Sequence, residues 1–382
     1  MTALPRGFRA HVANIGIKDD TTDFALVVGD EACAASAVFT QSRFAGPSVL
    51  LSRDHVANGS IRAVAVISKN ANVAVGPDGH ADALELARGV AKAVGCAPDE
   101  VLIASTGVIG RRYPIEKVRS HLAAGWTPDI TEAEPVAEAI MTTDTHAKTA
   151  AATVGDATIV GIAKGVGMIE PDMATMLAFV FTDADLPVAD LDPRFRAVVD
   201  RTFNCLSVDT DTSTSDTAAV LASGEAGAVD GDEFQAALES VCLDLTRQLA
   251  ADGEGAETLI TVTVDSARDH DQAKRVAKAI VNSPLVKTAV HGADPNWGRI
   301  AMAIGKCSDD TDIDQEHVVI RLGEQELYPA PADEAALAEL EEYLRGDEVL
   351  IHVSLNVAAG TATVYGCDLT DGYVRINADY TT

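Results

Sequence analysis

The sequence has few basic residues, few aromatic residues and no long apolar segment. Its 29 Lys and Arg residues face 58 Asp and Glu residues, so the formal net charge is −29, and no basic run offsets it locally. Nucleic acids and anionic membranes bind clustered cations, so the composition argues against both partners. No apolar stretch approaches the roughly 18–20 residues of a membrane helix. The large negative net charge is more typical of a device that keeps the protein soluble than of a binding surface.

Cysteine and histidine also lack the spacing of disulfide or metal sites. The 6 cysteines are scattered without a Cys-x-x-Cys pair, and the 9 histidines show no His-x-x-x-His spacing. Buried reduced thiols are therefore expected, and neither a metal nor an organic cofactor is predicted. Residues 1–8 contain no apolar segment typical of a signal peptide. These absences predict a cytoplasmic protein.

Apolar runs typical of strands alternate along the chain with segments that have helical periodicity. With 382 residues and 47% hydrophobic content, the chain can form two domains or two interlocked layers. Val- and Ile-rich runs predict strands, a hairpin is predicted over 153–162, and apolar periodicity predicts helices. The strands are 63–68, 101–104, 176–181, 218–222, 258–264, 318–322 and 350–357, and the helices are 82–94, 115–123, 195–203, 233–249, 273–281 and 333–344. The pattern predicts an α+β or α/β layered fold without fixing the strand order.

The glycine-rich segment 164–177 carries the most specific chemical signal. Two glycines and a proline precede Ala174, and Thr175 opens an apolar run. If the Ala174–Thr175 bond is cut, Thr175 gains a free α-amine with a reference pKa of about 7.7–8.0. This amine can act as a base beside the threonine hydroxyl, as in N-terminal nucleophile enzymes. Taken alone, however, the segment is more typical of a loop that enters a buried strand.

Other segments contain residue types suited to acyl transfer. Thr106 and Gly107 follow a predicted strand, where a hydroxyl and a backbone N–H can point at one developing oxyanion; an ordinary strand-ending turn is the alternative. Lys164 is a cation at the start of the glycine-rich segment, although a lone lysine is usually a surface charge. The hydroxyl-rich segment, residues 209–217, lacks the glycine and the final glutamate of a calcium loop. It predicts a turn network without a ligand.

Several further segments form one recognisable series along the chain. They are residues 43–47, 68–72, 105–110, 140–145, 209–217, 252–255, 282–289, 292–299 and 377–382. Together with 164–177 they closely resemble the ornithine acetyltransferase family, also called glutamate N-acetyltransferases, over essentially the whole chain. The resemblance implies a sandwich of β-sheets enclosed by helices. It also implies self-cleavage into two interlocked chains: 1–174, with the oxyanion hole and part of the substrate pocket, and 175–382, with the nucleophile and C-terminal substrate contacts.

The same resemblance implies an activity and a set of site residues. The acetyl group of N2-acetyl-L-ornithine would pass to L-glutamate through an acetyl-Thr175 intermediate, with Thr106 and Gly107 as the oxyanion hole. Lys164 and Glu254 supply a cation for the α-carboxylate and an anion for the ammonium of the substrate. The positions that match substrate contacts are Thr142, Lys164, Thr175, Glu254, Asn377 and Thr382. Two alpha and two beta chains would associate, with no cofactor.

Two other classes of function stay open from the sequence. A self-processing aminopeptidase or amidase would use the same Thr175 but pass the acyl group to water. A catalytically silent binding protein would keep the fold without cleaving itself. Asp172 and residues 306–312 are similar to the actinomycete paralogues associated with clavulanic acid clusters, so the pathway served, arginine or specialised metabolite, also stays open.

Overall fold

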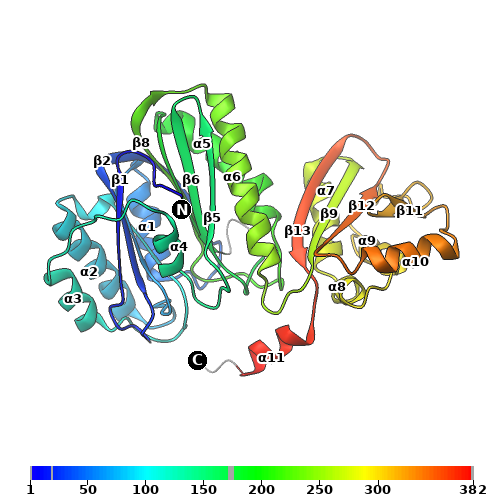
Figure 1. Ribbon diagram of the computed structural model, residues 1–382, viewed down its shortest axis with the longest axis horizontal. Coiled ribbons are helices and arrows are strands. Elements are labelled where there is room, and N and C mark those ends of the chain that lie inside the picture. Colours follow the sequence, from blue (N-terminus) through cyan, green and yellow to red (C-terminus); the bar gives the residue numbers. More distant parts are fainter. Residues whose placement is uncertain (1, 19, 171–175, 380–382) are drawn as a thin grey trace.

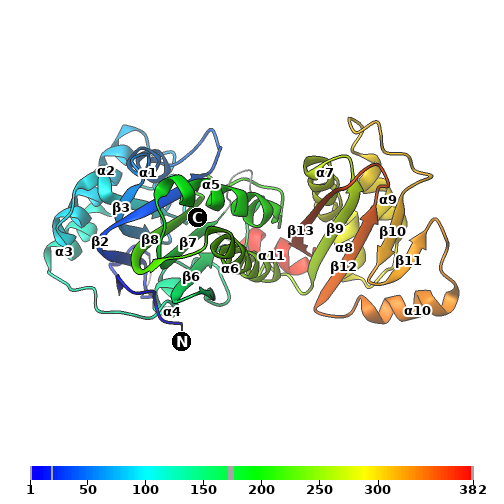
Figure 2. The same ribbon diagram turned by 90° about the horizontal axis from the view of Figure 1, so that it is seen from above.

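The computed structural model describes residues 2–18, 20–170 and 176–379. Two β-sheets stand side by side, each with its own helices (Figure 1), and the view from above shows the same division (Figure 2). Within the described residues, eight strands form the larger sheet and five form the smaller one. The layered arrangement of sheets and enclosing helices predicted from the sequence is confirmed.

The larger sheet contains strands from both sides of the Ala174–Thr175 junction. Its order is β4-β3-β2-β8-β7-β6-β5, and β1 pairs with β2 outside this path. The strands are β1 (Phe8–Ala13), β2 (Phe24–Phe39), β3 (Ser60–Ile67), β4 (Val101–Ser105), β5 (Lys148–Val154), β6 (Ala157–Lys164), β7 (Leu177–Asp185) and β8 (Thr217–Ala228). β7 runs antiparallel to β6 and parallel to β8. Two pieces produced by a cut before Thr175 would therefore stay joined by strand pairing.

The apolar run after the junction is buried on both faces of this sheet. Leu177, Phe179 and Phe181 pack into one core, whereas Ala178 and Val180 belong to the core on the opposite face. Alternate side chains of a strand point to opposite faces, so an unbroken apolar run fits a strand that is covered on both sides. Full burial of each large side chain contributes roughly 1.5–3 kcal/mol. This packing fixes the start of β7 inside the molecule.

Helices cover the larger sheet on both faces. They are α1 (Pro47–Val56), α2 (Pro77–Val94), α3 (Ile115–Ala123), α4 (Glu134–Ala139), α5 (Val188–Arg201) and α6 (Gly231–Ala251), with short 3-10 turns at Pro98–Glu100 and Phe203–Cys205. The helix predicted at 195–203 begins earlier than expected. Leu191, Phe195 and Val198 form one buried stripe, and their packing extends α5 through Pro193 despite its missing N–H.

The smaller sheet has the order β11-β10-β12-β9-β13. Its strands are β9 (Leu259–Ala267), β10 (Val319–Leu322), β11 (Gln325–Tyr328), β12 (Glu348–Ser354) and β13 (Gly360–Cys367), and its helices are α7 (His270–Val281), α8 (Pro284–His291), α9 (Trp297–Gly305) and α10 (Glu334–Tyr343). After β13, α11 (Asp371–Asp379) leads the chain back toward the larger sheet (Figure 1). None of the helices in the described ranges is long and apolar enough to span a membrane.

Candidate active site

A pocket of about 290 Å³ lies where β4, β6 and β7 come together. Lys164 ends β6 and pairs with Leu177, the first residue of β7, which in turn lies opposite Thr217 of β8. The predicted site residues that line this pocket are Thr106, Gly107, Thr142, Lys164, Glu254 and Asn377. Ala174, Thr175 and Thr382 lie outside the described residues. Met176, which follows Thr175 in the sequence, is also in the pocket wall.

The Thr106–Gly107 turn is held against the end of β3. Thr106 donates its N–H to the carbonyl oxygen of Ile67 at 3.1 Å. Gly107 has a φ of +123°, and a Cβ placed on it would stand 2.3 Å from the carbonyl carbon of Lys69. Only glycine tolerates both this conformation and this approach. The turn therefore has a fixed geometry, as an oxyanion hole requires.

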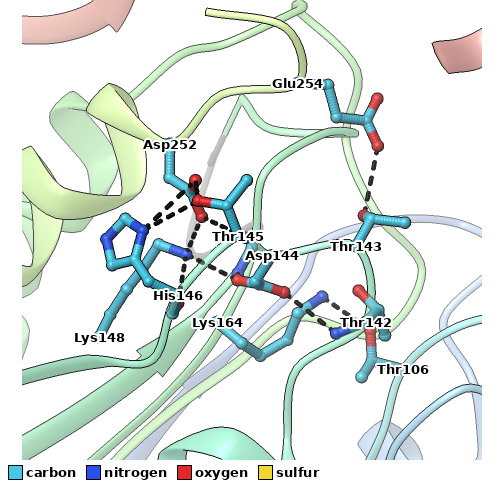
Figure 3. Close-up of polar contacts among 11 residues, drawn as sticks. Thr106, Thr142, Thr143, Asp144, Thr145, His146, Lys148, Lys164, Asp252 and Glu254 are labelled. Atoms are coloured by element: carbon cyan, nitrogen blue, oxygen red, sulfur yellow. Dashed lines mark hydrogen bonds and ion pairs between the residues drawn. The ribbon is translucent and has the colours of Figure 1, made fainter.

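Lys164 places a cation directly beside the Thr106 hydroxyl. Its Nζ donates to Thr106 Oγ1 at 3.1 Å, and the side chain is buried (Figure 3). Burial lowers the pKa of Lys164 below its ordinary value, while the negative charge of Asp144 offsets part of that effect. A hydroxyl that accepts from an ammonium still has its own proton to donate. Thr106 can therefore donate a hydrogen bond to a developing oxyanion.

A buried network of charged side chains lies next to Lys164 (Figure 3). Lys148 Nζ donates to Asp144 Oδ1 at 2.8 Å and to Asp252 Oδ2 at 2.5 Å, and the Lys148 and Asp144 side chains are fully buried. Asp144 also accepts from the N–H groups of Gly165 at 2.7 Å and Thr142 at 3.1 Å. Burial alone would raise the pKa of Asp144, but Lys164 and Lys148 outweigh it and the pKa lies below its ordinary value. The network fixes the loop that contains Thr142.

Glu254 supplies a negative charge at the pocket. Its Oε2 accepts from Asn377 Nδ2 at 2.8 Å, and its Oε1 accepts from Thr143 Oγ1 at 3.4 Å. Its own N–H donates to the carbonyl oxygen of Val166 at 2.8 Å, which joins it to the glycine-rich segment. In Figure 3, Glu254 lies beside Thr143 while Lys164 lies beside Thr106. The pocket wall thus contains both a cationic and an anionic side chain.

Four charged residues of this region have no role predicted from the sequence. Asp144, Lys148 and Asp252 form the buried network, and Asp216 lines the pocket itself. The i,i+4 spacing of Asp144 and Lys148 was a usable signal for a pair, but that spacing usually marks an exposed helix face. The participation of Asp252, more than a hundred residues away, depends on the tertiary fold.

Among the described residues, one group has a metal-ligand arrangement: Glu257, His291 and Asp368. It is not part of the pocket wall. The buried carboxylate of Asp368 is already used, because its Oδ1 accepts from the N–H groups of Glu257 at 2.9 Å and Thr258 at 3.1 Å. Its Oδ2 lies 3.1 Å from His291 Nδ1. These contacts explain the cluster without a metal: Asp368 and His291 hold the segment that precedes β9 in place.

The pocket has the size and the opposite charges that suit a small ligand with charges of both signs. The family model described as the ArgJ family matches residues 9–382, and the chain belongs to this family. It is 58% identical over 385 residues to "Glutamate N-acetyltransferase Oat2" of Streptomyces clavuligerus, a match that covers 99% of this chain and 98% of that protein.

Two further similarities agree with the family. The chain is 56% identical over 383 residues to "Arginine biosynthesis bifunctional protein ArgJ 2" of Nostoc sp., covering 100% of this chain and 99% of that protein. The crystal structure of the arginine biosynthesis bifunctional protein argJ from Bacillus halodurans is 42% identical with a TM-score of 0.50. That match covers 53% of this chain and 98% of the crystallised chain.

Proposed function

We propose that this enzyme transfers the acetyl group of N2-acetyl-L-ornithine to L-glutamate, giving L-ornithine and N-acetyl-L-glutamate. The observation that carries the proposal is the convergence of Thr106, Gly107, Lys164 and Glu254 on one pocket beside the start of β7. The relatives named as a glutamate N-acetyltransferase and as arginine biosynthesis proteins support the same chemistry. Neither metal nor organic cofactor is part of the proposal.

In the proposed reaction, Thr175 acts as nucleophile with its own α-amine as base. Its oxygen attacks the acetyl carbonyl carbon while the Thr106 hydroxyl and the Gly107 N–H donate to the oxyanion. The C–N bond then breaks, the hydroxyl proton passes through the α-amine to the leaving nitrogen, and ornithine departs. Glutamate enters the same pocket, and its amine takes the acetyl group from Thr175.

Charge recognition completes the proposed site. Lys164 binds the α-carboxylate of either substrate, and Glu254 binds the side-chain ammonium of the ornithine moiety, because each residue supplies the opposite charge. Thr142 and Asn377 add polar contacts, and Asn377 is already hydrogen-bonded to Glu254. Thr382 is assigned to the site from the family resemblance. One pocket that accepts both an acylated and a free amino acid suits an exchange of acetyl groups.

Self-cleavage before Thr175 is part of the proposal, since it alone frees the α-amine. A cut there leaves residues 175–382, which are 208 of 382 residues or about 54% of the chain. The Bacillus halodurans chain matches 53% of this chain at nearly its full length, which supports a division of the molecule into two pieces. We propose that two alpha (1–174) and two beta (175–382) chains assemble in the cytoplasm. The relatives named as arginine biosynthesis bifunctional proteins support arginine biosynthesis as the pathway served.

Ping-pong kinetics are expected, because one nucleophile serves donor and acceptor in turn. Initial rates measured with acetylornithine and glutamate varied together should give parallel double-reciprocal lines. Intersecting lines would contradict the acetyl-Thr175 intermediate and favour direct transfer in a ternary complex. Rapid release of acetate without glutamate would instead favour the hydrolase alternative.

Glu254→Gln is expected to raise the KM for N2-acetyl-L-ornithine by about tenfold or more, equivalent to at least about 1.4 kcal/mol. The variant keeps the side-chain shape and the Asn377 contact but removes the negative charge that faces the substrate ammonium. Glu257→Gln is the matched control, because this exposed carboxylate stands three residues further along. Steady-state kinetics should leave the control unchanged, and an unchanged KM in Glu254→Gln would remove Glu254 from substrate binding.

A further inference from the structure

Self-cleavage poses a chemical problem that acetyl transfer does not. The base of the proposed transfer is the α-amine of Thr175, but before cleavage that nitrogen is part of a peptide bond and is not basic. The Thr175 hydroxyl must still lose a proton, and the amide nitrogen must gain one as it leaves. A different group of the chain must therefore move this proton. The inference below rests on the proposed function and concerns only the cleavage step.

The hydroxyl-rich segment fixes the chain on both sides of the junction. On the upstream side, Asp209 accepts hydrogen bonds from the N–H groups of Met168 at 2.6 Å and Ile169 at 2.7 Å. On the downstream side, the N–H of Thr217 donates to the carbonyl oxygen of Met176 at 3.0 Å. One continuous segment thus holds both flanks of the bond to be cut. This is a role for the turn network that the sequence left without a ligand.

Asp216 is the acid of this segment that reaches the pocket. It is only 2% exposed and lies in the pocket wall directly before Thr217. Among the described residues, its Oδ2 is buried without a hydrogen-bond partner. Burial raises the pKa of Asp216 well above its ordinary value, and the Ser213 hydrogen bond and the charge of Lys164 only partly oppose this. A buried carboxyl group with one unpartnered oxygen is costly unless that oxygen serves a ligand or a reaction.

The other titratable groups of the pocket are already engaged. Lys164 donates to Thr106, and Glu254 accepts from Asn377 and Thr143. Asp144 is held by Lys148 and by backbone N–H groups. Lys148 and Lys164 are two buried cations, whereas Asp144, Asp252 and Asp216 are three buried carboxyl groups. If all three carboxyl groups were ionised, the negative charges would exceed the positive ones by one. A proton on Asp216 removes this excess.

We propose that Asp216 is the proton-transfer residue of self-cleavage. As the Thr175 oxygen bonds to the carbonyl carbon of Ala174, protonated Asp216 gives its proton to the nitrogen while the C–N bond breaks. It then takes the proton of the Thr175 hydroxyl and returns to its starting state. Water hydrolyses the resulting ester, which leaves a carboxylate on Ala174 and restores the hydroxyl of Thr175. One water molecule is consumed, as in any peptide hydrolysis.

The test is the rate of cleavage in freshly purified full-length chains, followed by intact mass. Asp216→Asn keeps the shape of the side chain but cannot transfer the proton, so cleavage should slow by about 10²-fold or more. Asp211→Asn is the matched control, because this exposed aspartate lies in the same segment and should be cut like the wild type. Asp216→Glu should recover part of the rate. Asp216→Ala should be slow and should be accelerated by added formate.

Each outcome bears on the inference. Normal cleavage of Asp216→Asn would overturn it, and so would slow cleavage that neither Asp216→Glu nor formate restores, since that pattern indicates a purely structural role. If Asp216→Asn fails to fold, as judged by circular dichroism, the formate response of Asp216→Ala decides. Cleavage of Thr175→Ala at the same bond would contradict the proposed nucleophile instead, so the two failures are distinguishable.

Discussion

Thr175→Ala is expected to yield a single uncut chain near 39.8 kDa that has lost acetyl transfer. The substitution removes the hydroxyl that attacks the Ala174 carbonyl, and without cleavage no α-amine is released to act as base. Because one residue supplies nucleophile and base, the loss of kcat/KM should be at least about a thousandfold. Intact mass and the acetylornithine–glutamate exchange rate measure the two effects.

Thr175→Ser is the control for this result, because serine keeps the hydroxyl and the same N-terminal amine. It should still be cut, and N-terminal sequencing of the larger fragment should begin Ser-Met-Leu-Ala. In the wild type the same fragment should begin Thr-Met-Leu-Ala. Fragmentation at another bond, or continued cutting of Thr175→Ala, would rule out the N-terminal nucleophile mechanism.

Lys148→Met is expected to cause the largest loss of stability among these variants, about 3–5 kcal/mol in the free energy of unfolding. Methionine fills a similar volume but leaves Asp144 and Asp252 without the cation that contacts both. Denaturant unfolding in the Thr175→Ala background measures the effect on one uncut chain. Lys92→Met, at an exposed position on α2, should stay within about 0.5 kcal/mol.

The difference between Lys148→Met and its parent should also depend on pH. In the parent, the pKa of Asp144 is lowered by folding, so its contribution is full above its unfolded pKa of about 3.9 and is lost as the pH falls through the folded value. In the variant, protonation of Asp144 and Asp252 at low pH removes their uncompensated negative charge and with it part of the stability loss. The two stabilities should therefore converge as the solution is acidified, and a gap that is independent of pH would contradict the ion-network explanation.

Strong periodicity in the sequence predicted many elements well. The helix at 115–123 coincides with α3, and the strand at 101–104 and the helix at 233–249 occur as β4 and α6 with slightly longer bounds. The sequence did not reveal β2 as a single strand of 16 residues. Its pairing with β3 shifts between Val28 and Cys33, and β8 pairs only with its second half. β2 is held by three partner strands, β1, β3 and β8. Its length therefore cannot be read from the local sequence pattern.

What the sequence predicted by itself was the chemistry that the chain can attempt. The roles of the Ala174–Thr175 junction, of the Thr106–Gly107 pair and of the charges of Lys164 and Glu254 were all predictions from residue types, order and family resemblance. Motifs of this kind are visible because their chemistry requires particular side chains at particular positions.

Only the tertiary structure decided which of these residues share a pocket and what supports them. Lys164 and Thr106 are 58 positions apart and come together because β4 and β6 end at the same place. Lys148 contacts Asp252 across 104 positions, and Asp216 enters the pocket wall through the pairing of β7 with β8. Contacts between distant segments depend on strand order and on the burial of charge. Both are properties of the packed molecule, which the local pattern of the chain does not encode.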